Sequence, residues 1–554
     1  MPLPAKIQKP SGEFNRKERN MAMVKGLNSK WFSTVASIWI QCTSGSLYTF
    51  SVYSQSLKST QGYDQSTLDT ISVFKDIGAN CGILSGILYS SVVVAANRNS
   101  SPLGAVAGPW MVLLAGALQN FAGYFLMWAA VVGVIPPPPV PVMCLFMILA
   151  AHAQSFFNTA NVVTSVRNFH QYSGTAVGIM KGFLGLSGAM LIQFYQTIFD
   201  NKPDSFLLML AVLPALNTLL LMWFVRVHSR HEEDEKKRLD GFSLIALIVA
   251  AYLMIIIVLE NFFSFHLVLR VVALVLLLVL LTSPLVVAIR AEGRGNSVVG
   301  TGDGRFLDES RLLPEENDNV EIHENVALPE LNLLQAISTV DFWILFLAMA
   351  CGMGSGLATV NNMGQVGQAL GYRSLETNTL VSLWSIWNFL GRFGGGYVSD
   401  YFLHKGGCAR PMFMAITLLG MSVGHGVIAS GFRGALYAGS VLLGVCYGSQ
   451  WSLMPSIASE IFGVEHMGTI FNTITIACPV GTYIFSVRVI GFIYDKEASG
   501  KGNLCTGTHC FMMSFVIMSC ATFLGSLAAL GLFLRTRMFY RQVILRRLRA
   551  SFRK

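Results

Sequence analysis

Long apolar runs separated by short polar segments dominate the chain. About 20 apolar residues are enough for one membrane-spanning helix, and fourteen stretches reach roughly that length. They lie near 31–53, 70–95, 108–132, 141–166, 174–198, 205–226, 242–262, 266–289, 341–360, 377–400, 411–430, 435–456, 468–493 and 511–534. The pattern predicts an all-α, polytopic membrane protein with about 14 transmembrane helices.

Two polar segments divide these spans into groups of six, two and six. The first is a charged linker at 228–240, and the second, at 291–340, is rich in Gly, Asp and Glu and is expected to be disordered. The predicted organisation is a basic tail (1–30), a six-helix bundle (31–227), the linker with two extra helices (228–290), an acidic cytoplasmic loop (291–340), a second six-helix bundle (341–534) and a basic tail (535–554).

Composition and charge agree with a membrane location. Charged residues make up 12% of the chain, about half of what soluble proteins carry. Of the 39 Lys and Arg residues, 28 fall in segments that lie inside if the amino terminus is cytoplasmic, and six fall in outside loops. Cytoplasmic loops are enriched in Lys and Arg, so both termini are expected in the cytoplasm, and the net charge of +9 does not indicate a nucleic-acid partner.

The second and tenth spans align without a gap. In ISVFKDIGANCGILSGILYS (71–90) and VSLWSIWNFLGRFGGGYVSD (381–400), Gly86 corresponds to Gly396. A second pair, GTAVGIMKG (174–182) and GTIFNTITI (468–476), aligns the fifth span of each half. Two parallel six-helix halves with a site between them are the architecture of major facilitator transporters.

Specific motifs carry a resemblance to a known family. The segment GRFGGGYVSD (391–400) resembles the loop motif of major facilitator proteins, and residues 30–86, 177–189 and 361–372 resemble the plant nodulin-like, nuclear-fusion-defective group. That resemblance implies a multi-pass membrane transporter. Ser90 stands where the motif of the first half would have an acid, so an inner lock built on that acid is expected only in the second half.

Ionisable residues inside the predicted spans are candidates for function, because a charge at the centre of a membrane helix is costly. They are Lys75, Asp76, Lys181 and Arg488. Neighbouring positions point about 100° apart on a helix, so Lys75 and Asp76 are expected to pair poorly with each other. These residues either form structural ion pairs between helices or bind substrate or protons.

The fourth span carries a polar stripe, in which Gln154, Asn158, Asn161 and Ser165 share one helix face. Such a stripe either lines a cavity or makes hydrogen bonds between helices. In proteins of the resembled kind, the first, fourth, ninth and twelfth spans line the cavity. The resemblance therefore nominates Gln41, Thr43, Tyr48, Gln154, Asn158, Asn161, Asn361, Asn362, Tyr447, Gln450 and Trp451 as substrate-binding candidates.

A cytoplasmic gate is the second candidate site. Asp400 ends the tenth span, Glu460 follows the twelfth, and Arg392 and Arg410 lie near them in sequence. Facilitator proteins of the resembled kind close their inner gate with such sets of acids and bases. We therefore expect these four residues to hold the inner side closed.

No catalytic motif, cofactor site or metal-binding spacing is recognisable in the sequence. The glycine run GMGSG (352–356) follows no strand and so does not indicate a dinucleotide site. The expected function is secondary transport by alternating access, driven by a proton or ion gradient. The intramembrane cations favour a small organic anion as substrate, while the amides keep a sugar open, and a non-transporting scaffold or sensor is a further alternative.

Three local features bear on the disulfide, the glycosylation and the membrane location of the protein. Cys505 and Cys510 fall in a predicted outside loop, where a disulfide is chemically allowed. Asn99 is in the only Asn-x-Ser/Thr sequence, on the predicted inner side, so no glycan is expected there. Asp308, Leu312 and Leu313 fit an acidic dileucine pattern for sorting adaptors, which predicts a vacuolar or other endomembrane; without it, the plasma membrane is expected.

Overall fold

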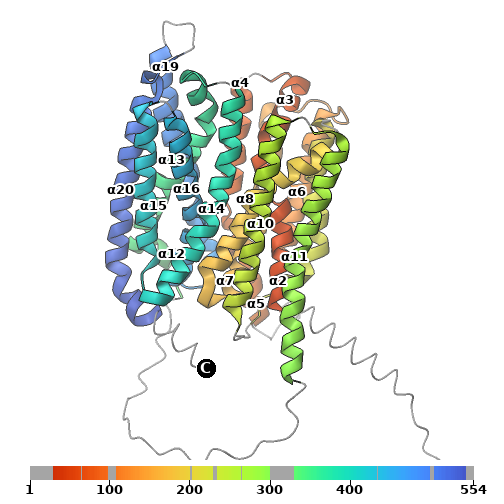
Figure 1. The fold of residues 1–554 in the computed structure, drawn as a ribbon, viewed down its shortest axis with the longest axis vertical. Helices are drawn as coiled ribbons and strands as arrows, with labels where there is room; N and C mark the ends of the chain where they lie inside the picture. Colours follow the sequence, from red (N-terminus) through yellow and green to blue (C-terminus); the bar gives the residue numbers. More distant parts are fainter. Residues whose placement is uncertain are drawn as a thin grey trace, which may run out of the picture.

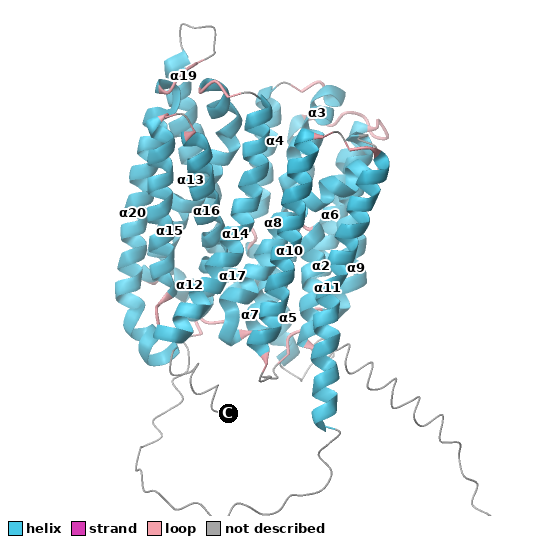
Figure 2. Cartoon of the chain, viewed as in Figure 1, coloured by secondary structure: helices cyan, strands magenta, loops and turns pink. Residues whose placement is uncertain are grey.

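A computed structural model describes residues 29–63, 65–97, 108–199, 203–228, 234–263, 265–299, 330–372, 374–432, 434–498 and 505–544. Within these ranges the regular secondary structure is entirely helical (Figure 2). Most helices run roughly along the vertical axis of Figure 1. We call the lower face of that view, where α2 begins and α20 ends, the inner face, and the opposite face the outer face.

The first half of the chain forms one bundle. It contains α2 (Lys30–Thr43), η1 (Ser46–Thr49), α3 (Phe50–Gln61), α4 (Gln65–Asn80), α5 (Ile83–Asn97), α6 (Trp110–Val131), α7 (Val140–Asn168), η2 (His170–Tyr172), α8 (Ser173–Ile198), α9 (Pro203–Leu221) and η3 (Met222–Phe224). The first predicted span is interrupted at Ser44 and Gly45, between α2 and η1, and the second at Cys81 and Gly82, between α4 and α5.

The rest of the chain supplies an added helix pair and the second bundle. The pair is α10 (Glu235–Phe262) and α11 (Leu267–Val299). The bundle contains α12 (Leu333–Ile337), α13 (Val340–Ala369), α14 (Ser374–Gly406), α15 (Arg410–Ser430), α16 (Ala435–Ile461), α17 (Met467–Thr475), α18 (Ala477–Thr482), the π-helix η4 (Tyr483–Gly491), α19 (Phe492–Ala498), α20 (His509–Phe539) and η5 (Tyr540–Ile544).

Eleven helical segments of the described chain are long and apolar enough to cross a membrane. The other three predicted spans correspond to the segment from α2 to α3, which is interrupted, and to α14 and α16. All three are nevertheless helical and run within the bundles (Figure 1). The polytopic helical fold is confirmed, whereas the count of fourteen and the cytoplasmic position of both termini stay predictions.

The added pair α10–α11 packs against the first bundle. Lys30 at the start of α2 forms a buried ion pair with Glu235 at 2.5 Å, and the Trp39 indole donates to the Leu281 carbonyl at 2.7 Å. The helix α10 begins at Glu235, so the end of the segment predicted as a linker is helical. Likewise, α11 continues to Val299 and α12 lies within 330–340. Both described ends of the loop predicted to be disordered, 291–299 and 330–340, therefore contain helix.

Glycines let the two bundles touch on the inner side. A Cβ atom on Gly86 would lie 2.5 Å from the Gly468 carbonyl oxygen, so α5 and α17 cross with no room for a side chain. A Cβ atom on Gly396 would lie 2.1 Å from the Gly174 carbonyl oxygen, where α14 crosses α8. These are the glycines that the internal repeat pairs, so the two crossings are equivalent contacts between the halves.

Candidate functional site

Two cations lie between the bundles at middle depth. Lys181 on α8 and Arg392 on α14 are each 1% exposed. At 1.5 Å per residue, Lys181 lies about 12 Å and Trp451 of α16 about 15 Å from the inner ends of their helices. The hydrocarbon core of a bilayer is about 30 Å thick, so this group lies close to its centre.

Lys181 faces aromatic rings instead of acids. Its Nζ atom lies 4.7 Å from the ring centroid of Trp451 and 4.8 Å from that of Phe471. Among the described residues, no carboxylate forms an ion pair with it. Cation–π contacts stabilise a desolvated ammonium by about 2 kcal/mol, which is less than the cost of burying an unpaired charge.

Arg392 spends three of its five N–H groups on neutral acceptors. Nε donates to Asn388 Oδ1 at 2.9 Å, Nη1 to the carbonyl of Lys181 at 3.1 Å and Nη2 to the hydroxyl of Tyr48 at 3.1 Å. Its guanidinium carbon lies 5.6 Å from the centroid of Trp451. Within the described structure, no carboxylate pairs with Arg392 either.

Buried amide groups without partners lie on α2 and α7 of the first bundle. Gln41 on α2 and Asn161 on α7 are 0% exposed, and both side-chain polar atoms of each lack a hydrogen bond. Asn158 Oδ1, Gln154 Oε1 and the Trp451 indole nitrogen are likewise buried without a partner. Leaving a buried polar group unsatisfied costs about 1–3 kcal/mol, so these atoms are suited to meeting water or a ligand.

Thr43 of α2 donates to the Ile40 carbonyl at 3.1 Å and accepts from the Asn217 amide at 2.9 Å. The other remaining predicted cavity residues belong to the second bundle. Asn362 donates to the hydroxyl of Ser486 at 2.8 Å, and Asn361 is exposed. Gln450 donates to the sulfur of Met421 at 3.0 Å, while Tyr447 is buried with its ring 6.4 Å from Trp451. Asn361 and Asn362 thus lie on the outer part of α13, whereas Tyr447 and Gln450 lie on α16, the helix that carries Trp451.

Two predictions about charged residues were wrong. Lys75 and Asp76 do pair, with Nζ and Oδ1 3.3 Å apart, because the long lysine side chain spans the angle between neighbouring helix positions. Arg488 lies in the π-helix η4 and is exposed, with its guanidinium 5.7 Å from the ring of Tyr483. Of the three intramembrane cations that favoured an anionic substrate, Lys75, Lys181 and Arg488, only Lys181 is both buried and without an ion-pair partner among the described residues.

Three of the four predicted gate residues meet at the inner face. Arg410 at the start of α15 forms ion pairs with Asp400 at 2.5 Å and with Glu460 at 2.7 Å. Its Nη1 donates to Ser399 and its Nη2 to Ser173 at the start of α8. Arg392 is not part of this network, because it lies two to three turns before Asp400 on α14 and points to the middle site.

Asp400 joins this network to the first bundle. Its carboxylate accepts from the amides of Gly174 and Thr175 and from the hydroxyl of Thr175. Backbone N–H groups at the amino terminus of a helix are unpaired and carry partial positive charge. Asp400 of one half therefore caps α8 of the other half.

The equivalent crossing of α5 and α17 uses a neutral residue, Asn472, which was not among the predicted site residues. Asn472 of α17 is 2% exposed and donates to Thr159 at 2.7 Å and to Ser85 at 3.3 Å. Ser90, which replaces the expected acid, leaves its hydroxyl unpaired. Asn472 lies four residues after Gly468 of the repeat, and that position is the signal that would have found it.

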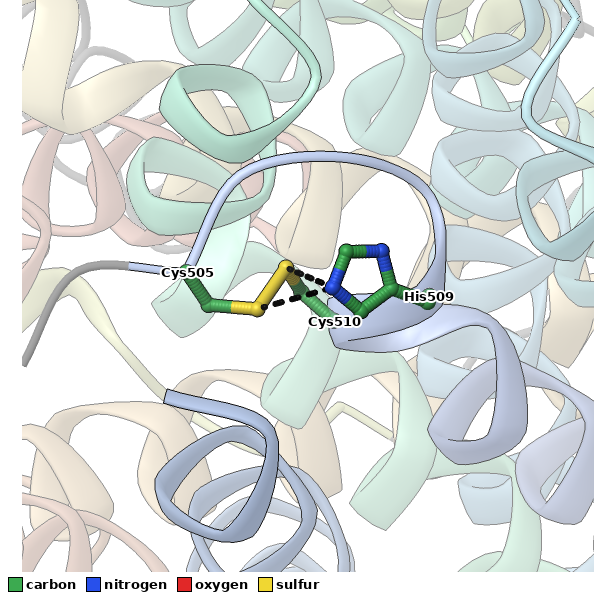
Figure 3. Close-up of side chains that lie close together, drawn as sticks. All are labelled: Cys505, His509 and Cys510. Atoms are coloured by element: carbon green, nitrogen blue, oxygen red, sulfur yellow. Dashed lines mark hydrogen bonds between the residues drawn. A yellow bond between two sulfur atoms is a disulfide. The ribbon is translucent and has the colours of Figure 1, made fainter. Parts of the chain in front are cut away.

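The outer side carries the predicted disulfide. Cys505 and Cys510 are bonded, and His509, the first residue of α20, lies beside the bond, with Nε2 3.7 and 4.0 Å from the two sulfur atoms (Figure 3). These three are the one group in the described chain with enough clustered donors for a metal ion. Both sulfurs are consumed by the disulfide, so they offer no thiolate ligand.

Comparisons with known proteins agree with these features. The family model named Nodulin-like matches residues 30–289, and a model named NFD4, C-terminal domain matches residues 324–542. The chain belongs to the nodulin-like family. A curated relative, Protein NUCLEAR FUSION DEFECTIVE 4 of Arabidopsis thaliana, is 26% identical over 93% of this chain and 90% of its own length.

More distant relatives of this nodulin-like protein match in part. The Probable transporter MCH1 of Yarrowia lipolytica is 26% identical over 35% of this chain and 41% of its own length. Among solved structures, the proton:xylose symporter XylE covers 90% of this chain and 94% of its own, at 14% identity and a TM-score of 0.52. The human organic anion transporter MFSD10 covers 90% and 100%, at 10% identity and a TM-score of 0.50. The fold is that of the major facilitator superfamily.

Proposed function

We propose that this nodulin-like membrane protein is a secondary transporter that moves a small organic anion by alternating access. The observation that carries the proposal is the pair Lys181 and Arg392, buried between the halves without a carboxylate partner in the described chain. Buried charges are normally paired, so an anionic substrate would supply the missing charge. A relative of similar fold is named an organic anion transporter.

The contacts between the halves support alternating access. The Asp400–Thr175 and Asn472–Thr159 hydrogen bonds join the halves on the inner side of Lys181. Both hydrogen bonds lie beside the two glycine crossings and join polar groups. The arrangement corresponds to a carrier that is closed on its inner side, in which rocking of the two bundles would break these contacts.

A gradient of protons or other ions is the proposed driving force, as in the proton symporter that shares the fold. The membrane is proposed to be vacuolar, another endomembrane or the plasma membrane. The sorting motif at Asp308, Leu312 and Leu313 and the glycosylation sequence at Asn99 lie outside the described residues, so both stay predictions.

A sugar is the second candidate substrate, and the unpaired amides favour it. Gln41 and Asn161 offer donors and acceptors of the kind that hydroxyl groups need. A neutral sugar would leave both cations uncompensated, which is why the anion is preferred. A scaffold or sensor without transport would leave both the cations and the amides unexplained.

Uptake into proteoliposomes tests the proposal. Purified protein should accumulate radiolabelled carboxylates under a pH gradient, and Lys181→Met should abolish this uptake. Lys405→Met is the matched control, because Lys405 is an exposed lysine near the end of α14. Accumulation of sugars but not of carboxylates would favour the second candidate, and no accumulation of either would favour the scaffold.

A further inference from the structure

We infer that the middle site recognises a dicarboxylate, with one carboxylate on Arg392, the other on Lys181 and the carbon spacer on Trp451. This inference rests on the proposed function and narrows its substrate class. It follows from three properties of the site: the number of uncompensated charges, the donors that remain free and the ring that both cations share.

The charge of the site requires two negative groups. Lys181 and Arg392 are buried. Among the described residues, Asp76 pairs with Lys75, and Asp400 and Glu460 both pair with Arg410, so these carboxylates already have other cations as partners. Two other cations on helices that pack against α8 also have partners. Lys30 of α2 pairs with Glu235 of α10, and Arg167 of α7 donates to the Val464 carbonyl. A monocarboxylate would neutralise only one of the two buried cations.

The free donors match carboxylates. Arg392 has used Nε and one N–H of each Nη atom, so one N–H remains on each of its two terminal nitrogens. Two parallel N–H groups on a guanidinium are the donors of a bidentate carboxylate pair. Lys181 Nζ makes only ring contacts in the described structure, which leaves its N–H groups for a second carboxylate.

The distances fit a short spacer. Lys181 Nζ and the Arg392 guanidinium carbon lie 4.7 and 5.6 Å from the centroid of the same Trp451 ring, so the two centres are at most about 10 Å apart. A charge-assisted hydrogen bond takes up about 2.7–2.9 Å at each end, so a short dicarboxylate fits within this limit. Its methylene groups would rest on the indole, whereas a compact anion such as phosphate would leave the indole uncovered.

Thermal-shift titration of purified protein at neutral pH, where both carboxylates are ionised, tests the inference. The probes are malonate, succinate, glutarate and adipate, with butyrate, inorganic phosphate and glucose as comparison ligands. At least one dicarboxylate should bind ten-fold or more tightly than butyrate and phosphate. Arg392→Lys, which keeps the charge but loses the bidentate fork, and Lys181→Met should each remove that preference, whereas Lys405→Met should not.

The outcomes separate the two claims. Equal or tighter binding of butyrate would overturn the dicarboxylate and leave the organic-anion function standing. Tighter binding of phosphate would overturn it in favour of a single compact anion. Stabilisation by glucose alone would remove both claims, and a dicarboxylate preference that survives in both variants would place its site elsewhere.

Discussion

Asp400 of the second half caps helix α8 of the first half at Thr175. One carboxylate oxygen accepts from the Thr175 amide at 2.5 Å and from its hydroxyl at 2.6 Å. The same carboxylate pairs with Arg410. A single acid thus connects the helix dipole of one bundle to the charged network of the other.

Replacing Asp400 with Asn should loosen the inner side. Asparagine keeps the shape but removes the charge that Arg410 and the amino terminus of α8 need, and breaking a buried pair costs about 3–5 kcal/mol. A cysteine at Ala176, which is 1% exposed, should then react at least ten-fold faster with a maleimide in a background without other free cysteines. Asp341→Asn is the control, because Asp341 pairs with Arg535 within one half. Equal labelling rates in both variants would contradict the lock.

Lys181→Met should abolish transport and leave folding intact. Methionine fills a similar volume, and removing an unpaired charge from the membrane interior relieves a cost of about 2.5–3.5 kcal/mol. The melting temperature without substrate should therefore stay the same or rise, while uptake falls to the level of empty liposomes. A structural lysine would give the opposite pair of results, with a lower melting temperature and residual uptake.

Asn472→Leu should weaken the neutral contact between α17 and the first half. Hydrogen bonds between membrane helices contribute about 0.6 kcal/mol each and at most about 1.7, so the closed inner side should lose about 1–2 kcal/mol. The Ala176 cysteine should react several-fold faster, but less than in Asp400→Asn. Asn120→Leu removes a comparable amide that bonds the Leu210 carbonyl within the first half, and it should not change labelling. An effect of Asn120→Leu as large as that of Asn472→Leu would mean that the bundles respond to general loosening.

Cys505 and Cys510 should resist alkylation until the protein is reduced. Both sulfurs are buried and bonded to each other. Mass spectrometry of denatured protein should therefore find these two positions modified only after a reductant, while Cys520, an exposed free cysteine, reacts without one. Modification of all three positions before reduction would rule out the disulfide.

Much of the fold could be predicted from the sequence because a bilayer imposes strict rules on the chain. Apolar runs mark the helices, and the repeat that aligns Gly86 with Gly396 correctly pairs the two helix crossings. Asp400, Arg410 and Glu460 were expected at one gate, and the structure brings them together. Lys181 was predicted as a site residue because placing a lone cation in an apolar membrane helix costs free energy, whatever the position of that helix in the bundle.

Which side chains meet was decided only by tertiary structure. Arg392 was expected at the gate with Asp400, its neighbour in sequence, but its place on α14 directs it to Lys181 and Tyr48 of the other half. Arg488 was expected to be buried, and its helix turns it outward. Asn472 was not predicted as a contact, because its partners come from two distant helices. Local sequence fixes where a helix lies along the chain, whereas the rotation of each helix and its neighbours depend on packing of the whole bundle.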